Sequence, residues 1–472
     1  MSDRKRKAPV DDAALGDAGS ERGASGFDHF AALSSPSPLA ADSYFLNLYA
    51  SEPNFKQLAR QDVAFASIYR EDGKLDFNDP SVMMQLTKTL LRIDFGLEIE
   101  LPEDRLCPPV PNRHNYILWL KGLLDTSSYE PTGRKILGID IGTGASCIYP
   151  LLGTAQRPWH FFATDIDPKS LEHARKNVWM NGLEDRIQVL ERTATSPLIP
   201  LSDLPVESVD FVMMNPPFYS SEDEMLSSAQ RKERPPHSAC TGAPVEMVCE
   251  GGEVAYIGRM MDESLVLRDR VQWYTAMVGK ASSIEILVGR LRKNCIDNFA
   301  VTEFVQGNRT RRWALGWSFG PMRPAEDVAR GIKATTWRNV LPPPLRTVIL
   351  TIPSRREVSP LVNRITEVIG ALELISWNWD SEPAKGVGRA SENVWGRAWR
   401  RKKLREAKEG ATLTEHTARP EKCQIGFAVK VDVGMEETVA SLHWVEGHDQ
   451  SIFESLCGFL QGKLQDIKES PK

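Results

Sequence analysis

The stretch IDIGTGASCIYPLLG, residues 139–153, begins inside the apolar run 135–141. That run predicts a buried strand. Gly142 and Gly144 come directly after this strand. Because glycine has no side chain, the chain can turn tightly there and a ligand can approach the main chain closely. Asp165 ends the next apolar run, where its carboxylate can accept hydrogen bonds from a ribose diol. The pattern predicts a strand, glycine loop and strand that bind an adenosine-containing cofactor.

The residues after the two glycines bear on which cofactor is bound. The pyrophosphate fingerprint of dinucleotide-binding proteins needs a third glycine, whereas Ala145, Ser146 and Cys147 stand here. This favours S-adenosyl-L-methionine over a dinucleotide. On this motif alone, a glycine turn that serves only the packing of the sheet stays open as an alternative.

Strands and helices alternate around this motif. The expected strands are the apolar runs at residues 135–141, 160–166, 187–190, 209–214, 273–278, 300–305 and 313–319. Such alternation is typical of a parallel sheet with helices on both faces. The last two runs are separated by the short turn QGNRTRR, which predicts a terminal antiparallel hairpin. We therefore expect an α/β protein with a class I (Rossmann-like) seven-stranded methyltransferase sheet.

Changes in composition divide the 472 residues into segments. Residues 1–40 are poor in large apolar groups and predict a disordered tail. The expected order after it is an N-terminal helical extension at 41–133, the methyltransferase core at 134–320, a proline-rich linker at 321–345, and a smaller α+β RNA-binding domain at 346–467 that carries a basic insertion at 381–420.

The composition also limits partners and location. A net charge of -5 excludes a protein that coats nucleic acid by bulk positive charge, so nucleic-acid contacts must come from local patches. Seven cysteines without a CxxC pair suggest neither a disulfide framework nor a zinc site, and we expect no metal, no membrane span and no obligate protein partner. The run RKRK at residues 4–7 is either a nuclear localisation signal or a solvated charge run, and we expect the nucleus, with the cytoplasm as a second location.

The sequence NPPF, Asn215, Pro216, Pro217 and Phe218, follows the fourth expected strand. An aromatic amine is a poor nucleophile, because its lone pair is delocalised into the ring. The Asn215 side-chain oxygen and the Pro216 carbonyl can both accept hydrogen bonds from such an amine, and Phe218 can stack on the base. At this edge of the sheet, the motif predicts catalytic residues for methylation of an adenine amine.

With these motifs in place, the sequence resembles the methyltransferase-like protein 16 family, the adenine-N6 methyltransferases of U6 small nuclear RNA. The resemblance is carried over residues 45–320 by LTKTLLRIDFGLEIELPEDRLCPPVPNRHNYILWL, GIDIGTGASCIYPLLG, MNPPF, CEGGEVAYIGRM, QWYTAMVGK and TEFVQGNRTRRWALGWSF. It implies that S-adenosyl-L-methionine is held by Arg113, Gly142, Gly144, Ser146, Asp165 and Asn215, and that Asn215 to Phe218 are catalytic. Its position just before an expected helix alone would predict that Arg113 is a surface residue.

The same resemblance implies contacts with RNA. Arg231, Lys232 and Arg234 lie in a segment that corresponds to a loop beside the active site, and Arg309, Arg311 and Arg312 lie on the expected hairpin. In the basic insertion, Arg400, Arg401 and Lys402 stand among Trp395 and Trp399, a composition that suits a disordered arm ordering on RNA. A solvated charged helix is the alternative.

Three other functions remain open from the sequence. Bacterial ribosomal RNA adenine-N6 methyltransferases share the core motifs. Protein glutamine-N5 methyltransferases also use an NPP motif, although that family favours tyrosine after the prolines. A non-catalytic RNA-binding factor is a further alternative, although it would not need Gly142, Gly144, Asp165 and Asn215 together.

Overall fold

The structure is a computed structural model that describes residues 38–69, 75–130, 133–230, 242–306, 310–332, 337–354, 357–408 and 422–469. Residues 1–37 of the expected tail, with the basic run 4–7, lie outside these ranges. Helix α1 (Pro38–Asn47) begins in a terminal unit that ends at Phe45, and residues 46–472 form the second unit. No helix in the described ranges is long and apolar enough to cross a membrane.

The larger sheet has the strand order β3-β2-β1-β4-β5-β7-β6-β8. The first five strands are parallel, and β7 runs antiparallel to both β5 and β6. The seven strands expected from the sequence are all present, which confirms the class I fold. Their bounds are β1 (Ile136–Ile141), β2 (Trp159–Asp165), β3 (Ile187–Glu191), β4 (Val209–Met214), β5 (Val271–Val278), β6 (Phe299–Gln306) and β7 (Thr310–Trp317).

An eighth strand extends this sheet. The two-residue β8 (Arg330–Gly331) pairs in parallel with β6 and follows the short helix α12 (Glu326–Ala329). Both elements fall in the segment 321–345 that we expected to be a plain linker. Two residues carry too little hydrophobic periodicity to be recognised as a strand from the sequence.

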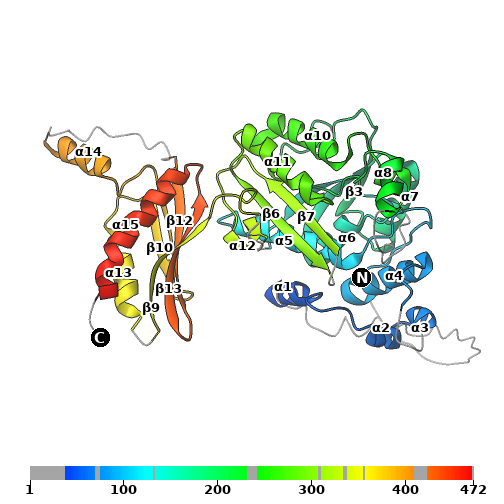
Figure 1. Ribbon diagram of the computed structural model, residues 1–472, viewed down its shortest axis with the longest axis horizontal. Coiled ribbons are helices and arrows are strands. Elements are labelled where there is room, and N and C mark those ends of the chain that lie inside the picture. Colours follow the sequence, from blue (N-terminus) through cyan, green and yellow to red (C-terminus); the bar gives the residue numbers. More distant parts are fainter. Residues whose placement is uncertain are drawn as a thin grey trace, which may run out of the picture. The chain divides into compact units, whose positions relative to one another are not determined.

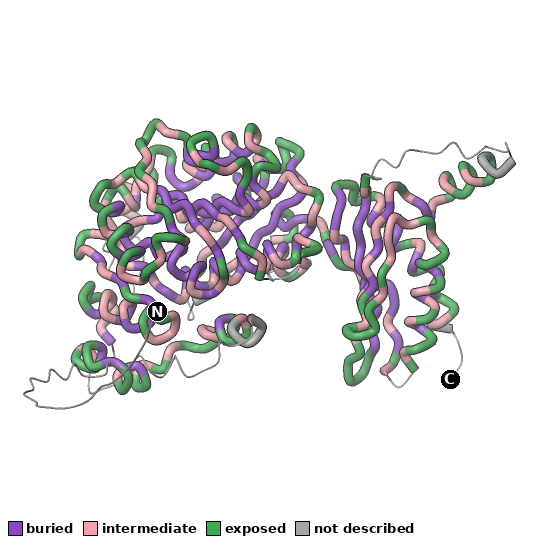
Figure 2. Tube along the Cα trace, turned by 180° about the vertical axis from the view of Figure 1, so that it is seen from behind, coloured by how far each residue is buried: buried purple, intermediate pink, exposed green. Residues whose placement is uncertain are grey.

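Two groups of helices cover the two faces of this sheet (Figure 1). Apolar residues of α5, α6 and α7 share one hydrophobic core with β1 and β2, and those of α10 and α11 share a second core with β4 and β5. Buried residues accordingly follow the strands and the helix faces that pack on them (Figure 2). These helices are α5 (Val110–Thr126), α6 (Ile148–Gln156), α7 (Pro168–Met180), α10 (Gly252–Leu267) and α11 (Ala281–Lys293).

The extension before β1 is helical, as expected. It consists of α2 (Phe55–Gln61), α3 (Val63–Ile68), α4 (Pro80–Phe95) and α5. Helix α4 begins after Asp79, whose side chain accepts from the Ser81 amide, and ends at Gly96 in the left-handed conformation. Helix α5 begins at Val110, before the apolar run YILWL. Its first turn therefore carries Arg113, which is 6% exposed and not a surface residue.

The second domain is built on an antiparallel sheet of order β10-β11-β12-β13-β9, with α13 and α15 packed on its apolar face. Its elements are β9 (Arg346–Pro353), α13 (Ser359–Gly370), β10 (Ser376–Asp380), β11 (Lys385–Ala390), α14 (Arg397–Lys408), β12 (Ile425–Val433), β13 (Glu437–Glu446) and α15 (Gln450–Glu469). The mixed α+β character agrees with the sequence-based expectation.

The basic insertion expected at 381–420 is partly wrong. Residues 385–390 form β11, a strand of the sheet, and residues 397–408 form the helix α14 instead of a disordered arm (Figure 1). Trp395 is buried and donates a hydrogen bond to the Ser455 hydroxyl of α15 at 3.1 Å, so its ring belongs to the core. The remainder of the insertion, residues 409–421, lies outside the described ranges.

Tight packing around a glycine explains how β11 can lie in the sheet although glycines weaken strands. A methyl group added at Gly386 would lie 2.1 Å from the Trp377 ring and 2.7 Å from the Trp379 ring. The two indoles therefore occupy the space that a side chain at Gly386 would fill.

We expect Gly386→Ala to destabilise the protein by about 1 to 3 kcal/mol, because the added methyl overpacks this core. Urea unfolding followed by tryptophan fluorescence measures the effect. Gly458→Ala, in α15, is the matched control, because a methyl there meets no atom within 4 Å. Equal stability of the two variants would contradict this account of the packing.

Candidate functional site

Three segments meet at the carboxyl edge of the large sheet. Ile141 of β1 is aligned with Thr164 of β2 and with Met214 of β4. The next residues along the three strands, Gly142, Asp165 and Asn215, therefore leave the sheet side by side. This register brings the glycine loop, the acidic residue and the NPPF motif together, as the sequence predicted.

The glycine loop depends on two left-handed residues. Gly142 and Gly144 have φ angles of 70° and 65°, a region that is costly for residues with a side chain. The amides of Gly142 and Thr143 both donate to the Thr164 carbonyl at 2.9 Å, which fixes the loop against β2. A methyl group at Gly142 would meet no atom within 4 Å, so open space lies beside the loop.

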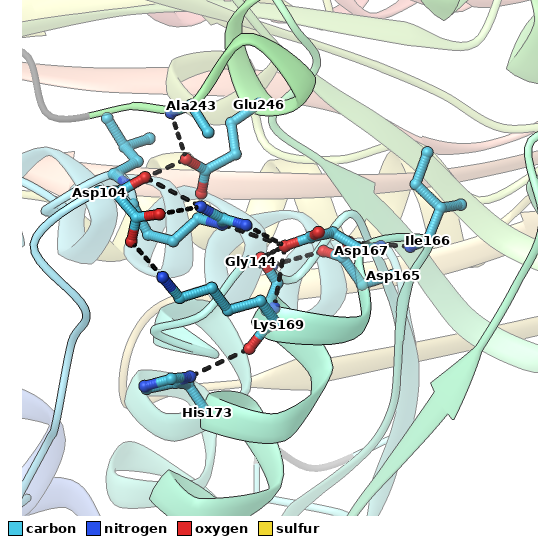
Figure 3. A network of polar contacts seen from close by, with 12 residues as sticks. Asp104, Gly144, Asp165, Ile166, Asp167, Lys169, His173, Ala243 and Glu246 are labelled. Carbon is cyan, nitrogen blue, oxygen red and sulfur yellow. Dashed lines mark hydrogen bonds and ion pairs between the residues drawn. The ribbon is translucent and has the colours of Figure 1, made fainter.

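Asp165 is held by backbone amides. Its Oδ2 accepts from the Gly144 amide at 2.8 Å, and its Oδ1 accepts from the Ile166 and Asp167 amides at 2.8 and 3.0 Å. Burial nevertheless raises the pKa of Asp165, because a charged carboxylate loses hydration there. Figure 3 shows this carboxylate beside the Gly144 backbone and near the ion pairs of Lys169 and Asp104.

Arg113 reaches the NPPF turn from α5. Its Nη1 donates to the Tyr149 hydroxyl at 2.8 Å, and its guanidinium carbon lies 5.5 Å from the centre of the Tyr149 ring. With the Asn215 amide oriented to face Arg113, the Asn215 oxygen accepts from Nη1 and Nη2 at 3.2 and 3.3 Å. The Nε of Arg113 is buried and has no hydrogen-bond partner among the described residues.

One cavity of about 730 Å³ joins these groups. Its lining includes all six residues for which the sequence predicted cofactor contact and also the two prolines of the motif. These residues are Arg113, Gly142, Gly144, Ser146, Asp165, Asn215, Pro216 and Pro217. Phe218, the last predicted catalytic residue, is not part of this lining.

The Phe218 ring packs against two neighbours. A methyl group at Gly279, directly after β5, would lie 2.7 Å from the ring, so the glycine allows the ring to lie against the backbone. The guanidinium carbon of Arg312 lies 5.5 Å from the ring centre. The predicted stacking residue is thus half-buried, with a cation on its ring.

Sequence reasoning missed a buried carboxylate that supports this arrangement. Glu253 of α10 is 2% exposed and accepts from the Gly279 amide at 2.6 Å, the Lys280 amide at 3.0 Å and the Ser283 hydroxyl at 2.6 Å. It therefore fixes the turn on which Phe218 lies. Burial raises the pKa of Glu253. A glutamate in the apolar-periodic run GGEVAYIGRM was the available signal.

The predicted RNA contacts are only partly described. Arg231, Lys232, Arg234 and Arg309 lie outside the described ranges. Arg311 is exposed and pairs with Glu303 at 3.0 Å, whereas Arg312 is drawn inward toward Phe218. On α14, Arg400 and Arg401 are exposed, and the Nζ of Lys402 lies 3.3 Å from a Glu392 carboxylate oxygen and 4.9 Å from the centre of the Trp399 ring.

No group of three or more His, Cys, Asp or Glu side chains within the described ranges is arranged to hold a metal ion.

Comparison with known proteins assigns the family. A family model described as RNA methyltransferase matches residues 41–321. The Schizosaccharomyces pombe protein named U6 small nuclear RNA (adenine-(43)-N(6))-methyltransferase is 33% identical over 399 residues, which cover 84% of this chain and 97% of that protein. The Mus musculus RNA N(6)-adenosine-methyltransferase METTL16 is 41% identical over 280 residues. These residues cover 58% of this chain, which spans about half (49%) of the mouse protein.

A solved structure agrees with this assignment. The hMettl16 catalytic domain in complex with MAT2A 3'UTR hairpin 1 is 41% identical, with a TM-score of 0.52, over 57% of this chain and 92% of that one. The chain therefore belongs to the methyltransferase-like protein 16 (METTL16) family of RNA methyltransferases.

Proposed function

We propose that this protein transfers a methyl group from S-adenosyl-L-methionine to the exocyclic N6 amine of an adenosine in U6 small nuclear RNA. The observation that carries the proposal is the single cavity that joins the glycine loop and Asp165 to the Asn215-Pro216-Pro217 turn. A methyl donor and an acceptor amine that meet in one cavity react as neighbours, which removes much of the entropic barrier.

The residues of the cavity fit the methyl donor. Arg113 has a buried Nε without a partner among the described residues, which suits a carboxylate such as that of the cofactor's methionine part. The open space at Gly142 admits a ligand against the main chain, and Asp165 suits the ribose. When bound, the sulfonium group supplies an electrophilic methyl.

The Asn215 turn positions the acceptor amine. Nη1 and Nη2 belong to one guanidinium and approach the Asn215 oxygen from one side, through contacts of 3.2 and 3.3 Å, so the other side of the oxygen can accept from the adenine amine. Arg113 thereby holds the oxygen, not the NH₂ group, toward the site. With the Pro216 carbonyl as second acceptor, the amine is held for attack. The amine loses a proton after methylation, so no side chain has to act as a base beforehand.

The Phe218 ring stacks on the target adenine after the base has left the RNA stack. An unstacked base gains about 1 to 3 kcal/mol from contact with an aromatic ring, which offsets part of the cost of extruding it from the RNA. Arg312 lies on the same ring, so its guanidinium either shares the ring with the base or moves to a phosphate.

The rest of the RNA is held by local basic surfaces. Helix α14 presents Arg400 and Arg401 to solvent, and Arg311 is exposed near the catalytic side of β7. The loop residues Arg231, Lys232, Arg234 and Arg309 complete our proposal for phosphate contacts. The name of the fission yeast relative, which matches across most of both chains, supports U6 small nuclear RNA as the substrate.

The other functions fit less well. Glutamine-N5 methylation of a protein needs neither a ring at Phe218 nor a basic helix such as α14. A non-catalytic RNA-binding factor would have no need of a cavity that joins Gly142, Asp165 and Asn215. Adenine-N6 methylation of ribosomal RNA uses the same site, and only a substrate assay separates it.

We expect Asn215→Ala to reduce methyl transfer to U6 RNA about 100-fold, because it removes an acceptor that orients the reacting amine. Transfer of labelled methyl measures the rate, and calorimetry with S-adenosylhomocysteine checks that the cofactor site persists. Methyl incorporation into a release factor, or into ribosomal RNA and not U6 RNA, by the unaltered protein would contradict the proposed substrate.

Gly279→Ala tests the position of Phe218. The added methyl would displace the ring, so we expect kcat to fall about tenfold or more while the affinity for S-adenosylhomocysteine is kept. Gly289→Ala in α11 is the matched control, because a methyl there meets no atom within 4 Å. An unchanged kcat for Gly279→Ala would show that the ring position does not matter.

The double variant Arg400→Gln, Arg401→Gln tests α14. Because bound phosphates release counterions, the dependence of log K on log salt should become shallower by about 2 for two lost contacts. Arg364→Gln, Lys463→Gln on α13 and α15 removes the same charge and is the control. Filter binding of U6 RNA over a salt series measures both, and equal slopes would refute a role for α14.

A further inference from the structure

Glu246 lies in the cavity wall that faces the glycine loop. It belongs to α9 (Pro244–Met247), and its Oε2 accepts from the amides of Leu106 and Ala243, both at 2.9 Å. Its Oε1 is turned toward the loop, because a methyl group added at Gly144 would lie 3.7 Å from it. Glu246 lines the same cavity as Asp165.

Two carboxylates therefore flank one glycine. Asp165 accepts from the Gly144 amide, and a methyl group at Gly144 would lie 3.7 Å from Oε1 of Glu246; Figure 3 draws all three residues. Burial is the main reason that the pKa values of both groups are raised, and the charge of Asp165 raises the pKa of Glu246 further. Such a pair is stabilised by hydrogen-bond donors placed between its members.

The nearby cation does not supply these donors. The Nε and Nη2 of Arg105 donate to Asp167 at 3.0 and 2.9 Å, and its Nη1 donates to Asp104 at 2.9 Å. Within the part of the chain that the structure describes, Oε1 of Glu246 receives no hydrogen bond. The free acceptor thus faces the cavity.

Asp165 cannot satisfy a ribose alone. A carboxylate offers about four lone-pair sites, and three backbone amides already occupy three of those on Asp165. About one site remains for two ribose hydroxyls. Among the residues that the structure describes, Glu246 accepts from two amides, both on Oε2. The second hydroxyl therefore needs an acceptor, and Oε1 of Glu246 is a free one on the facing wall.

We propose that Glu246 is a second cofactor-binding carboxylate, which accepts a hydrogen bond from the ribose hydroxyl that Asp165 cannot accommodate. The inference rests on the proposed function, since it presupposes an adenosyl cofactor in this cavity. In this proposal, the Glu246 side chain of α9 both accepts from the Leu106 and Ala243 amides and contacts the ligand.

The test is a double-variation cycle, in which the Glu246 side chain and one ribose hydroxyl of the ligand are removed singly and together. Calorimetry gives the Kd of S-adenosylhomocysteine and of its 2'-deoxy and 3'-deoxy analogues for the unaltered full-length protein and for Glu246→Ala. We expect Glu246→Ala to weaken S-adenosylhomocysteine about tenfold or more, the loss of one hydrogen bond to a charged group. For one of the two deoxy analogues this penalty should vanish, because the hydroxyl that Glu246 would contact is missing.

A purely structural role predicts a different result. If Glu246 only holds Leu106 and Ala243, its loss weakens all three ligands by the same factor, and that outcome would overturn the proposal. Glu246→Gln keeps a neutral acceptor and should recover part of the selectivity. Glu285→Ala, an exposed position of α11, is the control and should bind all three ligands as the unaltered protein does.

The assay contains no RNA, so its result does not depend on the RNA substrate. Failure of the unaltered protein to bind S-adenosylhomocysteine would contradict the methyl-donor assignment and this inference together. Binding of the cofactor without any dependence on Glu246 and a hydroxyl would contradict the inference alone.

Discussion

The site depends on the parallel register that aligns Ile141, Thr164 and Met214 in one row across β1, β2 and β4. Because side chains alternate between the faces of a sheet, a slip of one residue in any of these strands would turn its last side chain to the other face. The two hydrophobic cores fix this register, since each strand contributes alternate residues to one core and to the other. Packing energy far from the cavity thus determines where the Gly142 loop, Asp165 and Asn215 lie.

The contacts around the catalytic turn are mutual. Arg113 orients Asn215, and Tyr149 and Asn215 in turn accept from the Nη groups of Arg113. Glu253 fixes the turn at Gly279, and that glycine gives the Phe218 ring its place. A buried guanidinium and a buried carboxylate, each costly alone, are tolerated because their hydrogen bonds are made by the site that they build.

The sequence was most informative where a local rule decides the structure. Strand periodicity located the seven main strands, and residue chemistry located Gly142, Asp165 and Asn215. Tertiary contacts decide the structure elsewhere: β11 is rich in glycine, yet it pairs with β10 and β12, and the rings of Trp377 and Trp379 fill the space beside Gly386. The hydrogen bonds that occupy Asp165, and the approach of Glu246 from a distant segment, depend on backbone geometry that no residue pattern records.

The helical form of α14 has a consequence for affinity. A flexible arm would lose backbone freedom when it ordered on RNA, at a cost of about 1 to 2 kcal/mol for each residue fixed. In α14 that entropy is already lost on folding, and Trp395 attaches the segment just before the helix to α15. Binding then restricts only the arginine and lysine side chains, so a few phosphate contacts suffice, and a net negative protein can retain an RNA without a broad positive surface.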